Sequence, residues 1–255
     1  MIPHALNPLA RRLLDLVFPR VCPGCQEPLM DPHQPQLCLG CQGRLFRLEA
    51  PFCPVCGEKF HGILDPKRPC SNCAERSLSF DFARSSYHAH GLLRDLIHRL
   101  KYQGAIHLTP LLAHLLAPNL QDPRISDGAP WILVPVPLHP RRERKRRFNQ
   151  SAELAHLLSD RCGWPWLEAL LRTRASTPQA DLDRHERLQN LRGAFAVHPS
   201  PHVRERLIES RVLLVDDVLT TGSTAHECAK VLKDDANVAI VAVIAVARAG
   251  NPALG

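Results

Sequence analysis

The 255-residue chain is short of aromatic side chains and of long apolar runs. Phe, Trp and Tyr make up only 5% of it, and its longest uninterrupted apolar run is the ten residues 238–247. A helix that spans a bilayer needs about 20 apolar residues, so this run is too short for one, and its Val and Ile content is typical of a buried strand. Scarce aromatics also disfavour a protein that binds nucleic acid chiefly by stacking bases on exposed rings.

Signals for secretion are also lacking. A short amphipathic helix is predicted over residues 6–18, but neither the apolar core of a signal peptide nor a small-residue cleavage site follows it. We therefore expect a cytoplasmic protein without membrane insertion.

Cysteine is abundant, but its pattern is not that of a disulfide framework. Eight of the ten cysteines form four Cys-x-x-Cys pairs with the spacing of zinc knuckles: Cys22, Cys25, Cys38, Cys41, Cys53, Cys56, Cys70 and Cys73. Two pairs close one tetrahedral site, so we predict two structural zinc ions with no open position for catalysis. The pairs can combine sequentially, first with second and third with fourth. The alternative is an interleaved order, first with third and second with fourth. Disulfides, thiol exchange and an iron–sulfur cluster are alternatives.

The most informative stretch is residues 211–224. A continuous apolar run over 212–215 predicts a buried parallel strand, and the adjacent acids Asp216 and Asp217 follow it. Such a pair can accept hydrogen bonds from vicinal sugar hydroxyls and hold a hydrated Mg²⁺. The hydroxyl-rich turn that comes next leads into a predicted helix, and its residues are Thr220, Thr221, Gly222, Ser223 and Thr224.

This turn has the chemistry of an anion site. Gly222 can adopt a positive φ, which lets backbone N–H groups converge on an anion beside the positive end of the helix dipole. We interpret residues 211–224 as a grip for a ribose phosphate. A turn followed by a helix N-cap is the alternative.

The same stretch resembles the signature by which type I phosphoribosyltransferases bind phosphoribosyl pyrophosphate (PRPP): four apolar residues, two acids and a Thr-Thr-Gly-x-Thr loop. The resemblance implies that Asp216 and Asp217 are catalytic residues that bind the ribose hydroxyls, with Mg²⁺ bound alongside PRPP. It implies that residues 220–224 hold the 5′-phosphate.

The net charge of +7 is concentrated in a predicted loop over residues 141–147, which carries six cations and one acid. The cations are Arg141, Arg142, Arg144, Lys145, Arg146 and Arg147. Such a field favours a polyanionic partner, either pyrophosphate or nucleic acid, and a solvated charge run is the alternative. We expect Lys101 and Asn149 to contribute to the same site. A solvated helix end is the alternative for Lys101.

The order of predicted elements is that of an α/β domain. Strands are predicted over 80–88, 131–137, 212–215 and 238–247, and helices over 92–100, 111–116, 152–158 and from 223 onward. Alternating strands and helices predict a parallel sheet with ligand loops at the carboxyl ends of the strands. Two prolines restrict the 131–137 strand to a terminus or a sheet edge. Residues 171–195 are polar and predict either a flap beside the site or a plain surface excursion.

Taken together, these features resemble the ComF/GntX family, competence-associated proteins with an N-terminal double zinc ribbon and a phosphoribosyltransferase-type domain. The matching pieces are the four cysteine pairs, Leu100-Lys101-Tyr102 with Gly104, residues 134–139, Arg147-Phe148-Asn149-Gln150, Thr177-Pro178-Gln179, Arg187 with Asn190, and residues 216–224. One departure is that Arg147 stands where the family usually has glycine, in an Arg-Gly-Phe-Asn turn.

The resemblance implies a double zinc ribbon in residues 1–78 and, in residues 79–255, a type I phosphoribosyltransferase-like parallel sheet flanked by helices. It implies a protein that binds PRPP with Mg²⁺ and handles single-stranded DNA during natural transformation or use of DNA as a nutrient, with competence or DNA-uptake proteins as partners. An active transferase of unidentified acceptor and a PRPP-sensing regulatory module are alternatives. Tyr102, Phe148 and Trp164 are the candidates for stacking on bases.

Overall fold

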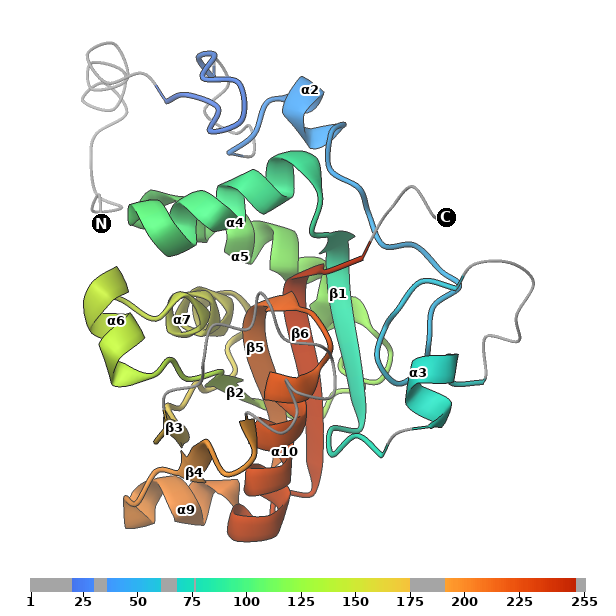
Figure 1. The fold of residues 1–255 in the computed structure, drawn as a ribbon, viewed down its shortest axis with the longest axis vertical. Helices are drawn as coiled ribbons and strands as arrows, with labels where there is room; N and C mark the ends of the chain where they lie inside the picture. Colours follow the sequence, from blue (N-terminus) through green and yellow to red (C-terminus); the bar gives the residue numbers. More distant parts are fainter. Residues whose placement is uncertain (1–19, 30–35, 61–67, 76, 175–190, 251–255) are drawn as a thin grey trace.

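The computed structural model describes residues 20–29, 36–60, 68–75, 77–174 and 191–250 (Figure 1). The predicted helix over 6–18 and the central part of the predicted flap, 175–190, lie outside the described residues. Every helix within the described ranges is too short or too polar to cross a membrane.

A four-stranded parallel sheet forms the centre of the molecule (Figure 1). Its strands lie in the order β1-β6-β5-β2, with bounds Phe82–His88, Ile240–Arg248, Arg211–Leu219 and Ile132–Pro135. The two central strands are β5 and β6, and their apolar residues enter two separate cores, in near alternation along each strand. The predicted α/β class, with a parallel sheet flanked by helices, is confirmed.

Helices cover both faces of the sheet. One core is closed by α4 (Gly91–Gln103), α5 (Thr109–Leu116) and α7 (Gln150–Cys162), which present rows of buried leucines. The other core is closed by α9 (Pro201–Leu207), α10 (Ser223–Ala236) and the antiparallel pair β3 (Leu170–Arg172) and β4 (Phe195–Val197). Short 3₁₀ turns, η1 (Ile106–Leu108) and η2 (Ala117–Gln121), flank α5.

The end strand β2 agrees with the prediction made from its prolines. It pairs only with β5 in the four-stranded sheet, and Pro135 is its last residue. An edge position suits proline because no further strand requires its missing N–H. The next residue, Val136, still donates to the carbonyl of Val215 at 3.0 Å, so the chain leaves the sheet level with the predicted acid pair.

The predicted basic loop over 141–147 is wrong in its secondary structure, because Pro140–Arg146 forms the helix α6. Pro140 occupies the first turn, where proline fits, and His139 caps it by accepting a hydrogen bond from the N–H of Arg141 at 3.2 Å. Arginine, lysine and glutamate are also good helix formers, a tendency that the charge pattern conceals. The helix ends at Arg147, whose φ of 69° lies in the left-handed region.

Two other boundaries differ from prediction. Strand β5 continues through Leu219, so Asp216 and Asp217 are the sixth and seventh of its nine residues rather than the residues after it. The two ends of the predicted flap are ordered as β3 and β4, which pair from Leu170 with Val197 to Arg172 with Phe195.

The cysteine-rich segment lies along the sheet and α4. Its first half, which includes α2 (Leu39–Gln42), rests on α4, where Arg99 donates to the carbonyl of Pro23 at 2.6 Å. Its second half, which includes α3 (Ser71–Ala74), meets the outer edge of β1, where Ala83 donates to the carbonyl of Val55 at 2.7 Å.

Further backbone hydrogen bonds cover the same edge. Between the two halves, Leu48 donates to Ser86 at 3.0 Å and His88 donates to Phe46 at 2.8 Å. The outer edge of β1 is therefore occupied by the cysteine-rich segment over much of its length.

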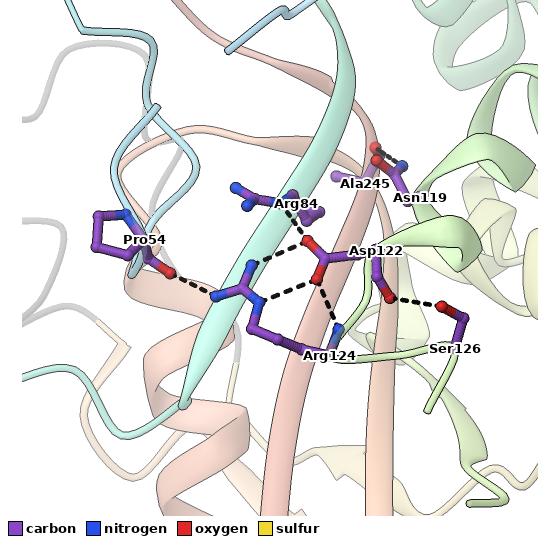
Figure 2. Close-up of polar contacts among 7 residues, drawn as sticks. All are labelled: Pro54, Arg84, Asn119, Asp122, Arg124, Ser126 and Ala245. Atoms are coloured by element: carbon purple, nitrogen blue, oxygen red, sulfur yellow. Dashed lines mark hydrogen bonds and ion pairs between the residues drawn. The ribbon is translucent and has the colours of Figure 1, made fainter. Parts of the chain in front are cut away.

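Arginine side chains complete this contact (Figure 2). Arg124 donates to the carbonyl of Pro54 at 2.8 Å and to both carboxylate oxygens of Asp122, and Arg84 of β1 donates to the same carboxylate. Arg84 also lies 3.6 Å from the ring centroid of Phe52. The carboxylate of Asp122 thus joins two guanidinium groups that both contact the cysteine-rich segment.

Candidate functional site

The eight paired cysteines gather into two clusters. Cys22, Cys25, Cys38 and Cys41 form one, and Cys53, Cys56, Cys70 and Cys73 form the other, with the sulfur atoms of each within 4.8 Å of one another. The sequential pairing is therefore confirmed and the interleaved pairing is wrong. Sulfur separations of 3.6 Å (Cys25 to Cys38) and 3.7 Å (Cys56 to Cys70) match the edge of a tetrahedron with Zn–S bonds of about 2.3 Å.

Backbone N–H groups point at the sulfurs in both clusters. Cys38 donates to the sulfur of Cys22 at 3.4 Å, and Cys70 donates to the sulfur of Cys53 at 3.3 Å. Such bonds stabilise thiolates and fix their direction. Four thiolates complete a tetrahedral zinc shell, so both clusters fit structural zinc sites.

The acid pair lies at the carboxyl end of β5 and faces a lysine. Lys101, in the last turn of α4, places its Nζ atom 2.8 Å from Oδ2 of Asp217, and only 3% of the Asp217 side chain is exposed. Burial alone would lower the pKa of Lys101, but the attraction of Asp217 outweighs it and raises that pKa. Lys101 therefore contacts the acid pair and is not a solvated helix end, while its contact with pyrophosphate or DNA stays a prediction.

Asp216 is held from two directions. Its Oδ1 atom accepts a hydrogen bond from the hydroxyl of Ser151 at 3.1 Å and from the backbone N–H of Asp217 at 2.9 Å. Burial, and then the negative charge of Asp217, raise the pKa of Asp216 to about 7. A carboxyl group with this pKa can exchange a proton near neutral pH, which is the property required of a general acid or base.

Ser151 is a site residue that the sequence did not reveal. It lies in the first turn of α7, whose N-cap Asn149 accepts a hydrogen bond from the backbone N–H of Ser151 at 3.0 Å. Asn149 also donates to the carbonyl of Val136 at 3.2 Å. The oxygen and the nitrogen of the Asn149 side chain thus both hold the segment between β2 and α7. A contact of Asn149 with phosphate, which stays a prediction, would have to leave these two hydrogen bonds in place.

The hydroxyl-rich turn adopts the expected backbone conformation. Gly222 has φ 76° and is the N-cap of α10, which confirms the predicted positive φ. The hydroxyls of Thr221 and Ser223 lie 2.8 Å apart, and Thr220 is exposed. The first-turn N–H groups of a 14-residue helix thus begin directly at the turn, which is the geometry of an anion site at a helix N-terminus.

The basic helix α6 approaches the acid site at its C-terminal end. The guanidinium of Arg146 lies 5.2 Å from the ring centroid of Tyr102, the neighbour of Lys101, and donates to Gln150 at 3.1 Å. None of the seven residues of α6, all of them described by the structure, is buried. Four of the predicted cations are exposed to solvent: Arg141, Arg144, Lys145 and Arg147.

The other end of α6 borders a cavity of about 420 Å³. Its lining includes His139, Glu143, Asn149, Arg172 and His198, together with apolar residues of β3. Arg172 is only 8% exposed and lies 5.3 Å from the ring centroid of Phe195. The first end of the predicted flap, in and after β3, therefore forms one wall of this cavity.

The three candidate stacking residues differ in exposure. Tyr102 is 66% exposed, and its ring lies 4.6 Å from that of His98. Phe148 and Trp164 are partly buried and pack against the first core. Of the three, Tyr102 has the accessible ring.

Two cysteines lie outside the four pairs, Cys162 and Cys228. Cys228 is fully buried in the second core, and burial raises the pKa of its thiol. Cys162 at the end of α7 is partly buried, and burial raises its pKa as well. Neither environment favours the thiolate, so neither side chain has the character of a nucleophile.

Comparison with known proteins gives matches over most of the chain. The family described as "Double zinc ribbon domain" matches residues 13–74. Competence protein F of Haemophilus influenzae is 32% identical over 186 residues, which cover 72% of this chain and 79% of that protein. DNA utilization protein YhgH of Escherichia coli K12 is 33% identical over 223 residues, which cover 85% and 92%. Competence protein ComFC of Bacillus subtilis is 25% identical over 210 residues, which cover 80% and 81%.

A solved structure described as the allosteric regulatory enzyme of purine biosynthesis aligns with 53% of this chain and 24% of its own, at 20% identity and a TM-score of 0.33. A likeness at this level does not indicate a shared activity.

Proposed function

This chain belongs to the ComF/GntX family of competence and DNA-utilization proteins and has an N-terminal double zinc ribbon, and from that premise we propose that its parallel-sheet domain is phosphoribosyltransferase-like, binds PRPP with Mg²⁺ and supports the uptake or use of single-stranded DNA. We place this activity in the cytoplasm, with competence or DNA-uptake proteins as partners.

The observation that carries the proposal is the buried contact of Lys101 with Asp217, beside Asp216 and immediately before the Gly222 turn. The two carboxylates would accept hydrogen bonds from ribose hydroxyls. The turn that would hold the phosphate begins three residues after Asp217, at Thr220. PRPP joins a ribose to a 5′-phosphate, so one molecule would contact both parts.

The residues present also suit Mg²⁺. Proteins commonly bind this ion through one or two carboxylates and the phosphates of a substrate, and Asp216 and Asp217 offer the carboxylate oxygens. When bound, Mg²⁺ would neutralise part of the pyrophosphate charge. Lys101 lies close enough to the same carboxylates to supply a further positive charge to that group.

The features that support DNA binding lie beside this site. Helix α6 exposes cations that nothing in the described part of the chain buries, and Arg146 connects them to the exposed ring of Tyr102. Cations that follow a phosphate backbone and a ring on which a base can stack are the two elements of single-strand recognition. Because α6 also borders the PRPP site, we expect DNA and PRPP to compete.

A second candidate is an active PRPP-dependent transferase. It is favoured by Asp216, whose pKa of about 7 suits proton transfer to or from an acceptor. Breakage of the bond between ribose and pyrophosphate would then depend on positioning and electrostatic stabilisation by the surrounding cations.

Isothermal titration of the full chain with PRPP and Mg²⁺, repeated with single-stranded DNA present, tests the proposal. We expect binding that requires Mg²⁺ and weakens when DNA is added. Asp217→Asn should remove most of the Mg²⁺-dependent affinity, and Gly222→Val should block the turn because a β-branched residue disfavours its positive φ. Unchanged titration curves for both variants would refute the site assignment.

A further inference from the structure

The second zinc site, formed by Cys53, Cys56, Cys70 and Cys73, is connected to the sheet by Arg248 at the end of β6. The side chain of Arg248 is 4% exposed. It donates to the carbonyl of Cys56 at 2.7 Å, approaches the sulfur of Cys56 at 3.5 Å and pairs with Glu58 at 2.6 Å. A group that donates to a metal ligand in this way fixes the ligand's direction.

Arg248 also lies beside the ribose-phosphate turn. It is in register with Leu219, the last residue of β5, and the next residue, Ala249, donates to the carbonyl of Leu219 at 2.9 Å. The turn begins at the following position, Thr220. A displacement of Arg248 would therefore be transmitted directly to the start of the turn.

The chain that leaves the second zinc site reaches the turn from another side. Leu78 packs against both this zinc site and the second core. Ser79 donates to Nδ1 of His226 in the first turn of α10 at 3.0 Å. The buried ring of Phe80 lies against Gly222, 3.5 Å from the position that a Cβ atom would take.

We propose that Arg248 is a positioning residue that couples the second zinc site to PRPP binding. Zinc at this site fixes Cys56 and Arg248, and through them the turn that holds the 5′-phosphate. By reciprocity, PRPP bound in the turn raises the affinity of this site for zinc. The inference rests on the proposed PRPP site and adds to it a dependence on a metal bound outside it.

The zinc affinity of the full-length protein tests this coupling. Equilibrium competition with a chromogenic chelator measures zinc affinity in excess Mg²⁺, with and without saturating PRPP. The two four-cysteine clusters should hold about two zinc ions per chain, and we expect PRPP to raise the affinity for one of them about 5- to 150-fold, the usual range of coupling between two sites.

Arg248→Ala should bind zinc at the second site about 10- to 100-fold more weakly, the usual effect of losing an outer-shell partner on metal affinity. This affinity should no longer respond to PRPP. Arg248→Lys keeps the positive charge but loses the planar fork that reaches both Cys56 and Glu58, so it should restore only part of the response.

Arg124→Ala is the matched control. Arg124 also donates to a carbonyl of the second zinc segment, that of Pro54 (Figure 2), but its own carbonyl accepts from Arg211, the first residue of β5. It therefore lies at the opposite end of β5 from the turn, and Arg124→Ala should keep the response to PRPP. Asp217→Asn, which should not bind PRPP, controls for direct capture of zinc by the ligand.

The outcomes separate this inference from the proposed function. If calorimetry shows PRPP binding but PRPP does not alter the zinc affinity of the parent, the coupling is refuted and the PRPP site stands. If the parent does not bind PRPP, the proposed function fails and the coupling fails with it. If Arg124→Ala loses the response as fully as Arg248→Ala does, the effect is general loosening of the ribbon and Arg248 has no special part in it.

Discussion

The guanidinium of Arg146 lies 5.2 Å from the ring centroid of Tyr102, so the C-terminal ends of α6 and α4 meet at one surface. Lys101, the residue before Tyr102, contacts Asp217 instead. Neighbouring residues of α4 thus take part in two sites: Tyr102 in a surface with Arg146, and Lys101 in the acid site. A single strand bound to this surface would lie beside the PRPP site.

Tyr102→Leu should weaken the binding of single-stranded DNA about 5- to 150-fold, because stacking of one base on an aromatic ring contributes about 1–3 kcal/mol. Tyr102→Phe should bind like the parent. Fluorescence anisotropy with a labelled oligothymidylate measures the affinity, and an abasic oligonucleotide of equal length keeps the phosphates but removes the bases. Equal discrimination against the abasic strand by the parent and Tyr102→Leu would exclude stacking on this ring.

Replacing Arg144, Arg146 and Arg147 with alanine should reduce the salt dependence of DNA binding. Each phosphate contact contributes about −0.7 to the slope of log affinity against log salt concentration for a single strand, so three lost contacts make the slope shallower by about two. Anisotropy titrations at several salt concentrations give this slope. As a control, alanine at Arg204 and Lys230, exposed cations on the opposite face of the sheet, should leave the slope unchanged. A parent-like slope in the triple variant would show that α6 is only a solvated surface.

PRPP affinity in the presence of Mg²⁺ should rise with pH through about 7. The pKa of Asp216 is raised to about 7 by burial and by the charge of Asp217, so its carboxylate, the form that binds a cation, becomes predominant only above that pH. Calorimetry from pH 6 to pH 8 measures the effect. Asp216→Asn has no titrating group at this position and should show a flatter profile, after correction for the titration of PRPP itself.

Arg147→Gly should stabilise helix α6. Arg147 ends this helix with φ 69°, a conformation that costs an L-residue about 1 kcal/mol and that glycine adopts freely. Hydrogen exchange of the peptide that spans α6 should slow about fivefold. Arg147→Ala is the control because it removes the same charge without removing the backbone strain, and an equal change in both variants would show that charge rather than conformation is responsible.

The sequence predicts the parts of the fold that are written in local patterns. Three features are each predicted from a few neighbouring residues. The apolar run at 212–215 is part of a central strand, the prolines after Trp131 mark an edge strand, and the four cysteine pairs form two four-cysteine clusters. The pairing of the cysteines could not be predicted, because both arrangements use the same spacing.

The missed features depend on contacts between distant residues. Ser151 donates to Asp216 across 65 positions, and Arg248 reaches Cys56 across 192. No periodicity or motif marks such a contact. The helix in the basic segment is missed for a different reason. Its run of charges indicates the kind of partner that it would bind, but a run of charges is compatible with either a loop or a helix.

The cysteine-rich segment has a further consequence through its backbone contacts with β1. An uncovered outer strand presents free N–H and C=O groups that can recruit a strand from another molecule. Here Leu48, Val55 and Phe46 provide partners for that strand from within the same chain. A fragment that begins at residue 79 would lose all three, and we expect it to self-associate through β1 even when its own core is intact. The ribbon therefore protects the edge of the sheet in addition to holding the two cysteine clusters.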